Sequence, residues 1–117
     1  MKKIFMVLAT VLAAQSVWAQ VYFGQVRVHS VNTEYTTITN NSSGNLRLNN
    51  VFSTGIYFDA RHSCYGTIHP YESCTVQVQF WPQNVGYYST TIYLNFTDDF
   101  THQSFTHFLN ASGNAVP

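Results

Sequence analysis

Two histidines and the only two cysteines of the chain lie close together, in the order His62, Cys64, His69 and Cys74. Imidazole nitrogens and thiolates are the ligands that zinc prefers, so this stretch could form a metal site. The spacing matches no standard short zinc pattern, however, and oxidation would remove both thiolates. We therefore predict a disulfide between Cys64 and Cys74, with no metal and no cofactor. A His/Cys metal-binding protein remains the least favoured alternative.

Other pairs of reactive residues are better explained by structure. Asp98 and Asp99 could act as paired carboxylates, but adjacent acids in a loop between two strands favour turning and solubility. His102 and His107 could meet at a loop–strand junction, where solvated or hydrogen-bonded histidines are commoner than a metal site. The sequence contains no Gly-x-Ser-x-Gly, His-Glu-x-x-His or P-loop motif. We therefore predict that the protein is not an enzyme.

Aromatic side chains give the one positive indication of function. Tyrosine and tryptophan anchor many binding surfaces, because their rings combine apolar area with a polar tip. The cysteine loop carries two tyrosines, and strand alternation directs further rings away from the inner face, among them Tyr35 and Tyr87. Cross-strand aromatic pairing on a solvated sheet is the structural alternative. The candidate binding residues are Trp81, Tyr65, Tyr71, Tyr57 and Tyr93.

Short strands must position these residues. The chain after its first residues has little helical periodicity and is rich in Thr, Tyr, Phe, Val and Asn, in runs separated by Asn, Ser, Gly and Pro. This pattern predicts an all-β fold, an immunoglobulin-like two-sheet antiparallel β-sandwich of about seven strands. Alternation over 73–81 places Cys74, Val76, Val78 and Phe80 on the inner face, whereas the register of 104–111 is ambiguous. The predicted strands cover residues 21–28, 34–40, 46–51, 56–60, 73–81, 87–96 and 104–111.

The first residues predict export. Lys2 and Lys3 precede an apolar run that is shorter than the ~20 residues of a membrane-spanning helix, and small residues follow it. We expect a signal peptide over 1–19, cleavage after Ala19, and one domain over 20–117, with no transmembrane segment after cleavage. The remaining basic residues are three arginines against five acidic residues, so nucleic acid is a poor candidate partner.

Several short motifs follow one another along most of the chain. They include Phe23-Gly24, Ile38-Thr39-Asn40, Gly55-x-x-Phe58, Ser73-Cys74-x-Val76-x-Val78-x-Phe80-x-Pro82 and Gly86-x-Tyr88-Ser89-x-x-Ile92-x-Leu94. Together they resemble the abnormal-spindle/Hydin-type (ASH, choice-of-anchor D-like) immunoglobulin-like domain, which is related in architecture to PapD-like sandwiches. The resemblance covers nearly all of residues 22–115. It implies the fold and a binding or scaffolding role, and it carries no catalytic residues, because the family shares no active site.

Two departures from that family concern turns. The family usually has Pro-Gly where this chain has Pro70-Tyr71. A type II turn needs a positive φ at its third residue, so Tyr71 predicts a type I turn instead. The glycine that the family has soon after Asn40 is here Ser42, with Gly44 displaced.

These observations together predict a non-catalytic exported immunoglobulin-like module that binds protein. A free-standing domain of this size suits a subunit or accessory of a bacterial cell-envelope or secretion assembly, with its protein partner in the cell envelope. The expected location is periplasmic or secreted. The alternative is a carbohydrate-binding module that uses exposed tryptophan and tyrosine rings as stacking surfaces.

Overall fold

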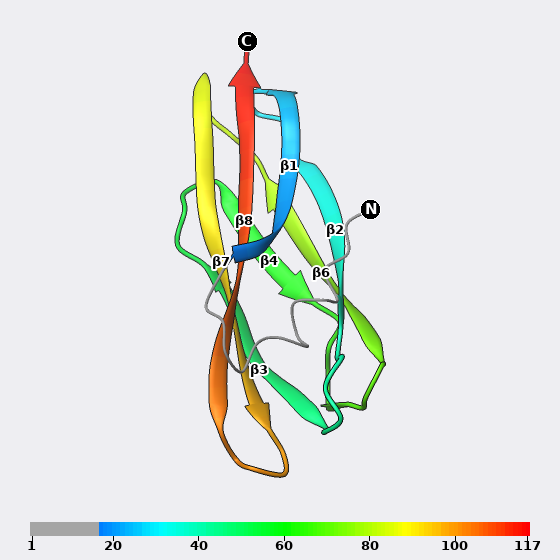
Figure 1. The fold of residues 1–117 in the computed structure, drawn as a ribbon. Coiled ribbons are helices and arrows are strands. Elements are labelled where there is room, and N and C mark those ends of the chain that lie inside the picture. The colour runs from blue at the N-terminus through cyan, green and yellow to red at the C-terminus, as the bar shows by residue number, and fades with distance from the viewer. Residues whose placement is uncertain (1–16) are drawn as a thin grey trace.

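The computed structural model describes residues 17–117, which form two packed β-sheets with a long axis of 49 Å and two short axes of 22 Å (Figure 1). The larger sheet has the strand order β1-β8-β7-β3-β5, and the smaller sheet has the order β2-β6-β4. This part of the chain contains no helix that is long and apolar enough to span a membrane. The strands are β1 (Val17–Arg27), β2 (Asn32–Thr39), β3 (Leu46–Ser53), β4 (Phe58–His62), β5 (Thr67–Ile68), β6 (Ser73–Phe80), β7 (Gly86–Asp98) and β8 (Ser104–Val116).

The fold class agrees with the sequence prediction, with one difference in strand direction. Every pair of neighbouring strands is antiparallel except β1 and β8, which run parallel from Val17↔Phe108 to Arg27↔Val116. These are the first and last strands, so no hairpin joins them and nothing forces them to be antiparallel. The larger sheet is therefore mixed.

The core lies between the two sheets and follows the predicted alternation. On β6, Val76, Val78 and Phe80 are fully buried, as are the inward side chains Ile92, Leu94 and Phe96 of β7. The ring of Phe80 stacks on that of Phe58 with a centroid separation of 4.4 Å, which joins β6 to the neighbouring β4. Period-two alternation is enough to predict these faces, because each strand lies between core and solvent.

Several boundaries differ from the predicted ones: β4 covers Phe58–His62 where 56–60 was predicted, and most other strands begin or end a residue or more away. The two-residue β5 was not predicted, because so short a strand leaves no periodic pattern. Strand β8 continues past Ala111 to Val116, although Ser112-Gly113-Asn114 has the composition of a turn. The predicted signal peptide, residues 1–19, lies outside the described residues except for its last part, 17–19. This part belongs to β1, which begins at Val17.

Strand β8, whose register the sequence left ambiguous, places a histidine in the core. His107 pairs with Leu94 across the sheet and is buried, and its Nε2 atom has no hydrogen-bond partner. Burial disfavours the charged imidazolium, and it lowers the pKa of His107 from its ordinary value near 6.5 to about 4. His107 is therefore a neutral core residue, and the metal pair with His102 has no support in its surroundings.

Acid is expected to destabilise the protein through His107. The unfolded chain takes up a proton near pH 6.5 and the folded chain only near pH 4. The contribution of neutral His107 to stability is therefore fully present above about pH 6.5. About 3 kcal/mol of the free energy of unfolding is lost as the pH falls to 4. Urea unfolding from pH 7 to pH 4 measures this loss. The variant His107→Leu cannot titrate and should show a flatter pH dependence; equal pH dependence in both proteins would refute this role.

Candidate functional site

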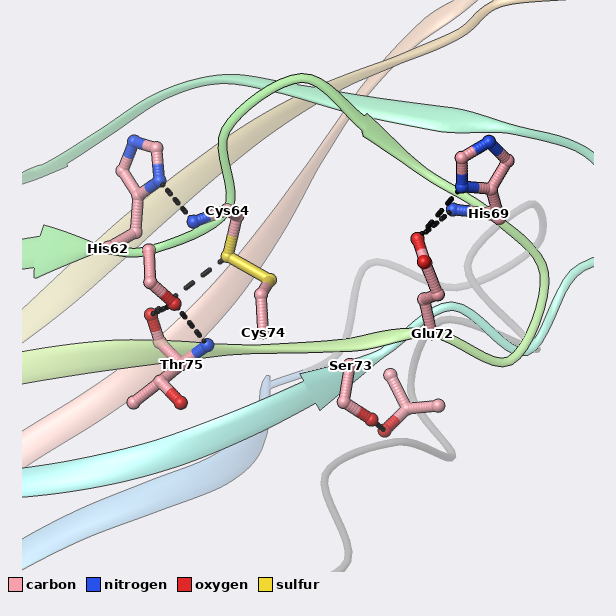
Figure 2. The surroundings of a disulfide bond; sticks show 9 residues. His62, Cys64, His69, Glu72, Ser73, Cys74 and Thr75 are labelled. Atoms are coloured by element: carbon pink, nitrogen blue, oxygen red, sulfur yellow. Dashed lines mark hydrogen bonds and ion pairs between the residues drawn. A yellow bond between two sulfur atoms is a disulfide. The ribbon is translucent and has the colours of Figure 1, made fainter.

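The cysteine loop joins the end of β4 to the start of β6 and is closed by a disulfide. Cys64 and Cys74 are bonded through their sulfur atoms, with their Cα atoms 5.2 Å apart, as the sequence predicted (Figure 2). Beside the disulfide, Ser63 N–H donates to the carbonyl of Thr75 at 2.9 Å, and Thr75 N–H donates to Ser63 Oγ at 3.0 Å. The base of the loop is therefore fixed both covalently and by hydrogen bonds.

The far end of the loop is a tight turn over residues 69–72. Glu72 N–H donates to the carbonyl of His69 at 3.0 Å, and His69 N–H donates to Glu72 Oε1 at 2.8 Å. The second of these bonds, with one from the His69 ring, lowers the pKa of the Glu72 carboxyl. The turn is thus held by its own first and last residues.

The predicted type I conformation of this turn is wrong. Pro70 occupies its second position, and Tyr71 occupies its third position with a φ of 68°, which is the pattern of a type II turn. The reason is tertiary, because the backbone of Asn40 accepts from Tyr71 N–H and donates to the carbonyl of Glu72. These two bonds outweigh the local preference of a non-glycine residue for negative φ.

Asn40 holds the loop to the turn between β2 and β3. Its side-chain Nδ2 donates to the carbonyls of Gly44 and Ile68, both at 2.8 Å. Its Oδ1 accepts from Ser42 N–H at 2.9 Å and from Ser42 Oγ at 2.6 Å. Asn40 is fully buried, so these bonds replace all the water contacts that its amide gives up. Composition identified Asn40 only as a turn residue.

The two histidines near the cysteines do not converge. His62 and His69 lie on opposite sides of the disulfide in Figure 2. His62 Nδ1 accepts from Cys64 N–H at 3.0 Å, and partial burial lowers the pKa of this histidine. His69 Nδ1 lies 3.0 Å from Glu72 Oε1. Among residues 17–117, no group of three or more His, Cys, Asp or Glu side chains is placed to hold a metal ion.

The acidic pair of the β7–β8 loop has a structural role. Asp98 Oδ1 accepts from the backbone N–H groups of Phe100 at 2.8 Å and Thr101 at 3.1 Å, which fixes the turn. Asp99 pairs with Arg47 at 3.3 Å on the surface. The two carboxylates thus have separate partners.

Two of the five candidate binding residues are prominent on the cysteine loop. The side chains of Tyr65 and Tyr71 are 79% and 73% exposed. The ring of Tyr65 contacts that of His62 at a centroid separation of 4.9 Å, which restricts its orientation. The loop therefore presents two large aromatic side chains to solvent on a fixed backbone.

The other three candidates lie elsewhere. Tyr57 and Trp81 meet near the opposite end of β6, where Trp81 N–H donates to the carbonyl of Tyr57 at 2.9 Å. Tyr57 was expected to point away from the inner face, but its ring packs against the core and makes an edge contact with Tyr88 at 5.2 Å. Tyr93 lies half-buried on the larger sheet, in a row of rings with Phe52 and Phe108. The five candidates therefore do not form one site.

Loss of the disulfide is expected to destabilise the domain. The disulfide closes a short loop and restricts the unfolded chain, so Cys64→Ser or Cys74→Ser should each lower the free energy of unfolding by about 3 kcal/mol. Urea denaturation measures the change. A reducing agent should cause a similar loss in the unmodified protein and none in the variants. An unchanged denaturation midpoint in either variant would contradict the prediction.

Comparison with known proteins identifies a family of domains. The family model for the HYDIN/CFA65/VesB-like, Ig-like domain matches residues 17–111. No curated protein sequence matches the chain significantly.

Solved structures share the fold at low sequence identity. The VesB protease of Vibrio cholerae aligns with a TM-score of 0.72 and 19% identity, over 94% of this chain and 35% of that one. The ASH/PapD-like domain 7 of human CEP192 aligns with a TM-score of 0.64 and 13% identity, over 83% and 80% of the two chains. The secreted serine protease VesC of Vibrio cholerae aligns with a TM-score of 0.58 and 20% identity, over 82% and 22%. The chain thus spans only a small part of either protease.

Proposed function

This chain belongs to the HYDIN/CFA65/VesB-like, Ig-like domain family, and from that premise we propose that it is a non-catalytic exported module that binds a protein partner. The partner belongs to the bacterial cell envelope or to a secretion assembly, in which this chain is a subunit or an accessory. The contact surface is the cysteine loop, with Tyr65 and Tyr71 as its anchors.

The conformation of Tyr71 is the observation that carries this proposal. A φ of 68° costs a non-glycine residue about 1–2 kcal/mol relative to ordinary backbone. The side chain is 73% exposed, so it gains little from burial in return. His29, Tyr57 and His102 also have a positive φ, but among residues 17–117 only Tyr71 combines it with an exposed tyrosine, phenylalanine or tryptophan ring. Strained residues are enriched at functional sites, and tyrosine is among the commonest anchors of protein interfaces. A role in binding accounts for a tyrosine where glycine would fold more easily.

Rigidity of the loop favours binding. The disulfide fixes its base, and the hydrogen bonds of Asn40 fix the turn that carries Tyr71. A surface that is already ordered loses less conformational entropy when a partner docks, so more of the contact energy remains as affinity.

The titratable groups support binding over catalysis. Among residues 17–117, the groups with shifted pKa values are His62, Glu72 and His107, and each has a separate structural cause. His107 lies in the core, and Glu72 is tied to the turn by His69. Enzymes gather such groups in one cleft, where they act on the same substrate.

Export is supported by two independent features. Disulfides form and persist in oxidising compartments such as the bacterial periplasm and the extracellular medium. The Cys64–Cys74 bond suits such a compartment, and the lysine-led apolar start of the chain suits a signal peptide. The similarity to a protease described as secreted agrees with this location.

Site-specific crosslinking tests the proposal. A photoreactive amino acid placed at Tyr65 in cells should crosslink the chain to one recurrent envelope protein. The same group at Tyr87, which is 66% exposed and lies on the larger sheet away from the cysteine loop, is the matched control and should not capture that protein. Crosslinks from Tyr87 alone, or no recurrent product from Tyr65, would refute the loop as the contact surface.

A further inference from the structure

A shallow cleft of about 430 Å³ crosses the outer face of the larger sheet, away from the cysteine loop. It spans β1, β8 and β7 and is bounded on one side by the loop after β3. Its lining includes the side chains of Gln20, Tyr87, Ser89, Thr91, Asn110 and Ser112.

The cleft arises from the sizes of the outward side chains along β7 and β8. Ser89 lies opposite Ser112, and Thr91 lies opposite Asn110, so short side chains meet in the middle of the sheet. Larger rings precede and follow them on the same face of β7, because alternate residues of a strand share a face. The lining of the cleft runs along β7 from Tyr87 to Thr91, roughly 14 Å of extended strand, so the depression is long enough for a short oligosaccharide.

The wall formed by the loop after β3 lies close against the sheet. Gly55 N–H donates to Thr90 Oγ1 at 2.7 Å, and a Cβ at Gly55 would come within 2.5 Å of Thr90 Cβ. The hydroxyl of Thr90 also lies 3.3 Å from Ser53 Oγ. Because the Thr90 side chain points inward, these contacts hold the loop that bounds the cleft in place at the edge of the sheet.

Aromatic rings lie at one end of the cleft and beyond its other end. At one end, Tyr87 and Tyr22 are each 66% exposed, and Tyr22 is the β1 neighbour of Ser112. Beyond the other end, Tyr93, which does not line the cleft, lies between Phe52, with centroids 4.9 Å apart, and Phe108, with centroids 5.3 Å apart. The second group is already ordered by its own ring contacts.

The chemistry of the lining selects among possible occupants. None of the side chains that line the cleft carries a charge, and cleavage after Ala19 would add one charged group at its edge, the α-amino group of Gln20. The side chains offer hydroxyl and amide groups, which both donate and accept hydrogen bonds. An anionic ligand would find no arginine or lysine there. A protein partner is also disfavoured, because serine and alanine are depleted in protein interfaces. Sugar hydroxyls match the amides, and the apolar faces of sugar rings match the tyrosines.

We propose that this cleft binds a neutral oligosaccharide. Its hydroxyl groups hydrogen-bond to Gln20, Asn110 and Ser112, and Tyr87 supplies a stacking surface at one end. This site is separate from the proposed protein-binding loop and goes beyond that function, so either can fail without the other.

Titration with neutral hexasaccharides tests the site. The full exported chain, labelled with ¹⁵N, is titrated with cellohexaose, laminarihexaose, maltohexaose, mannohexaose and chitohexaose, and with an anionic galacturonan of the same length. We expect at least one neutral sugar to bind in the sub-millimolar range and to shift the amide signals of Ser89, Asn110 and Ser112. Tyr87→Ala should weaken binding at least about tenfold, and Ser112→Phe, which fills the floor, should abolish it.

Phe100→Ala is the matched control, because it also removes an exposed ring, in the loop between β7 and β8, and should leave sugar affinity unchanged. The melting temperature of each variant shows whether it folds, and Tyr87→Ala removes only an exposed ring. The inference is overturned if no neutral hexasaccharide binds, if only the anionic sugar binds, if the shifted signals lie on the cysteine loop, or if folded Tyr87→Ala keeps full affinity.

Discussion

Replacement of Asn40 by alanine is expected to lower the free energy of unfolding by about 4 kcal/mol. The substitution removes two hydrogen bonds that Nδ2 donates and two that Oδ1 accepts. The carbonyl of Ile68 belongs to the cysteine loop, and that of Gly44 to the turn after β2, so the variant loses the side-chain link between these two segments and keeps only the backbone bonds of residue 40 to the loop. Because the site is fully buried, the abandoned groups cannot all turn to water.

Urea denaturation of Asn40→Ala measures this loss. The matched control is Asn49→Ala, since Asn49 is exposed and its side chain donates only to Thr97 Oγ1 on the surface, at 2.7 Å. The control should change stability by no more than about 0.5 kcal/mol. A similar small effect for Asn40→Ala would mean that the loop is held without this side chain.

Replacement of Gly113 by valine is the second change with a large expected effect, a loss of about 3 kcal/mol in the free energy of unfolding. Gly113 lies on the inward face of β8, beneath the ring of Phe80. A Cβ there would come within 2.5 Å of Phe80 Cε2 and 3.1 Å of Phe23 Cβ. Phe80 is fully buried and stacked on Phe58, so it cannot move aside without disrupting the core.

Thermal and urea unfolding of Gly113→Val, beside Gly113→Ala, measure the cost of overpacking. We expect the loss to increase with the size of the new side chain, and Ser112→Ala on the opposite face of β8 to be nearly neutral. If Gly113→Val retained the stability of the unmodified protein, the contact of β8 with Phe80 would not be as close as the structure places it.

Local pattern was enough to predict the sandwich but not its long-range contacts. Strand β6 was predicted almost to the residue, because its buried valines alternate with polar residues. Strand β8 was not, because its outward face carries Phe108 and its inward face carries His107, so polarity does not distinguish the two faces. Pairing with β7, which sets Leu94 opposite His107, decides the register.

The turn of the cysteine loop is a second feature that local sequence pattern could not predict. The disulfide follows from residue type and compartment, and the sequence predicted it correctly. The conformation of Tyr71 does not follow, because it is imposed by the backbone of Asn40, which is distant in sequence. The sequence did carry one signal for the outer cleft: the order Tyr87-x-Ser89-x-Thr91-x-Tyr93 places short side chains between rings on one face.

The central claim is that Tyr71 is present for binding at the expense of stability. Tyr71→Gly tests it most directly, with unfolding and partner binding measured on the same protein. Relief of about 1–2 kcal/mol of backbone strain outweighs the greater chain entropy of glycine, so stability should rise by about 1 kcal/mol. Affinity for the envelope protein crosslinked at Tyr65 should fall at least about tenfold. Unchanged affinity in a stabilised Tyr71→Gly protein would contradict the account.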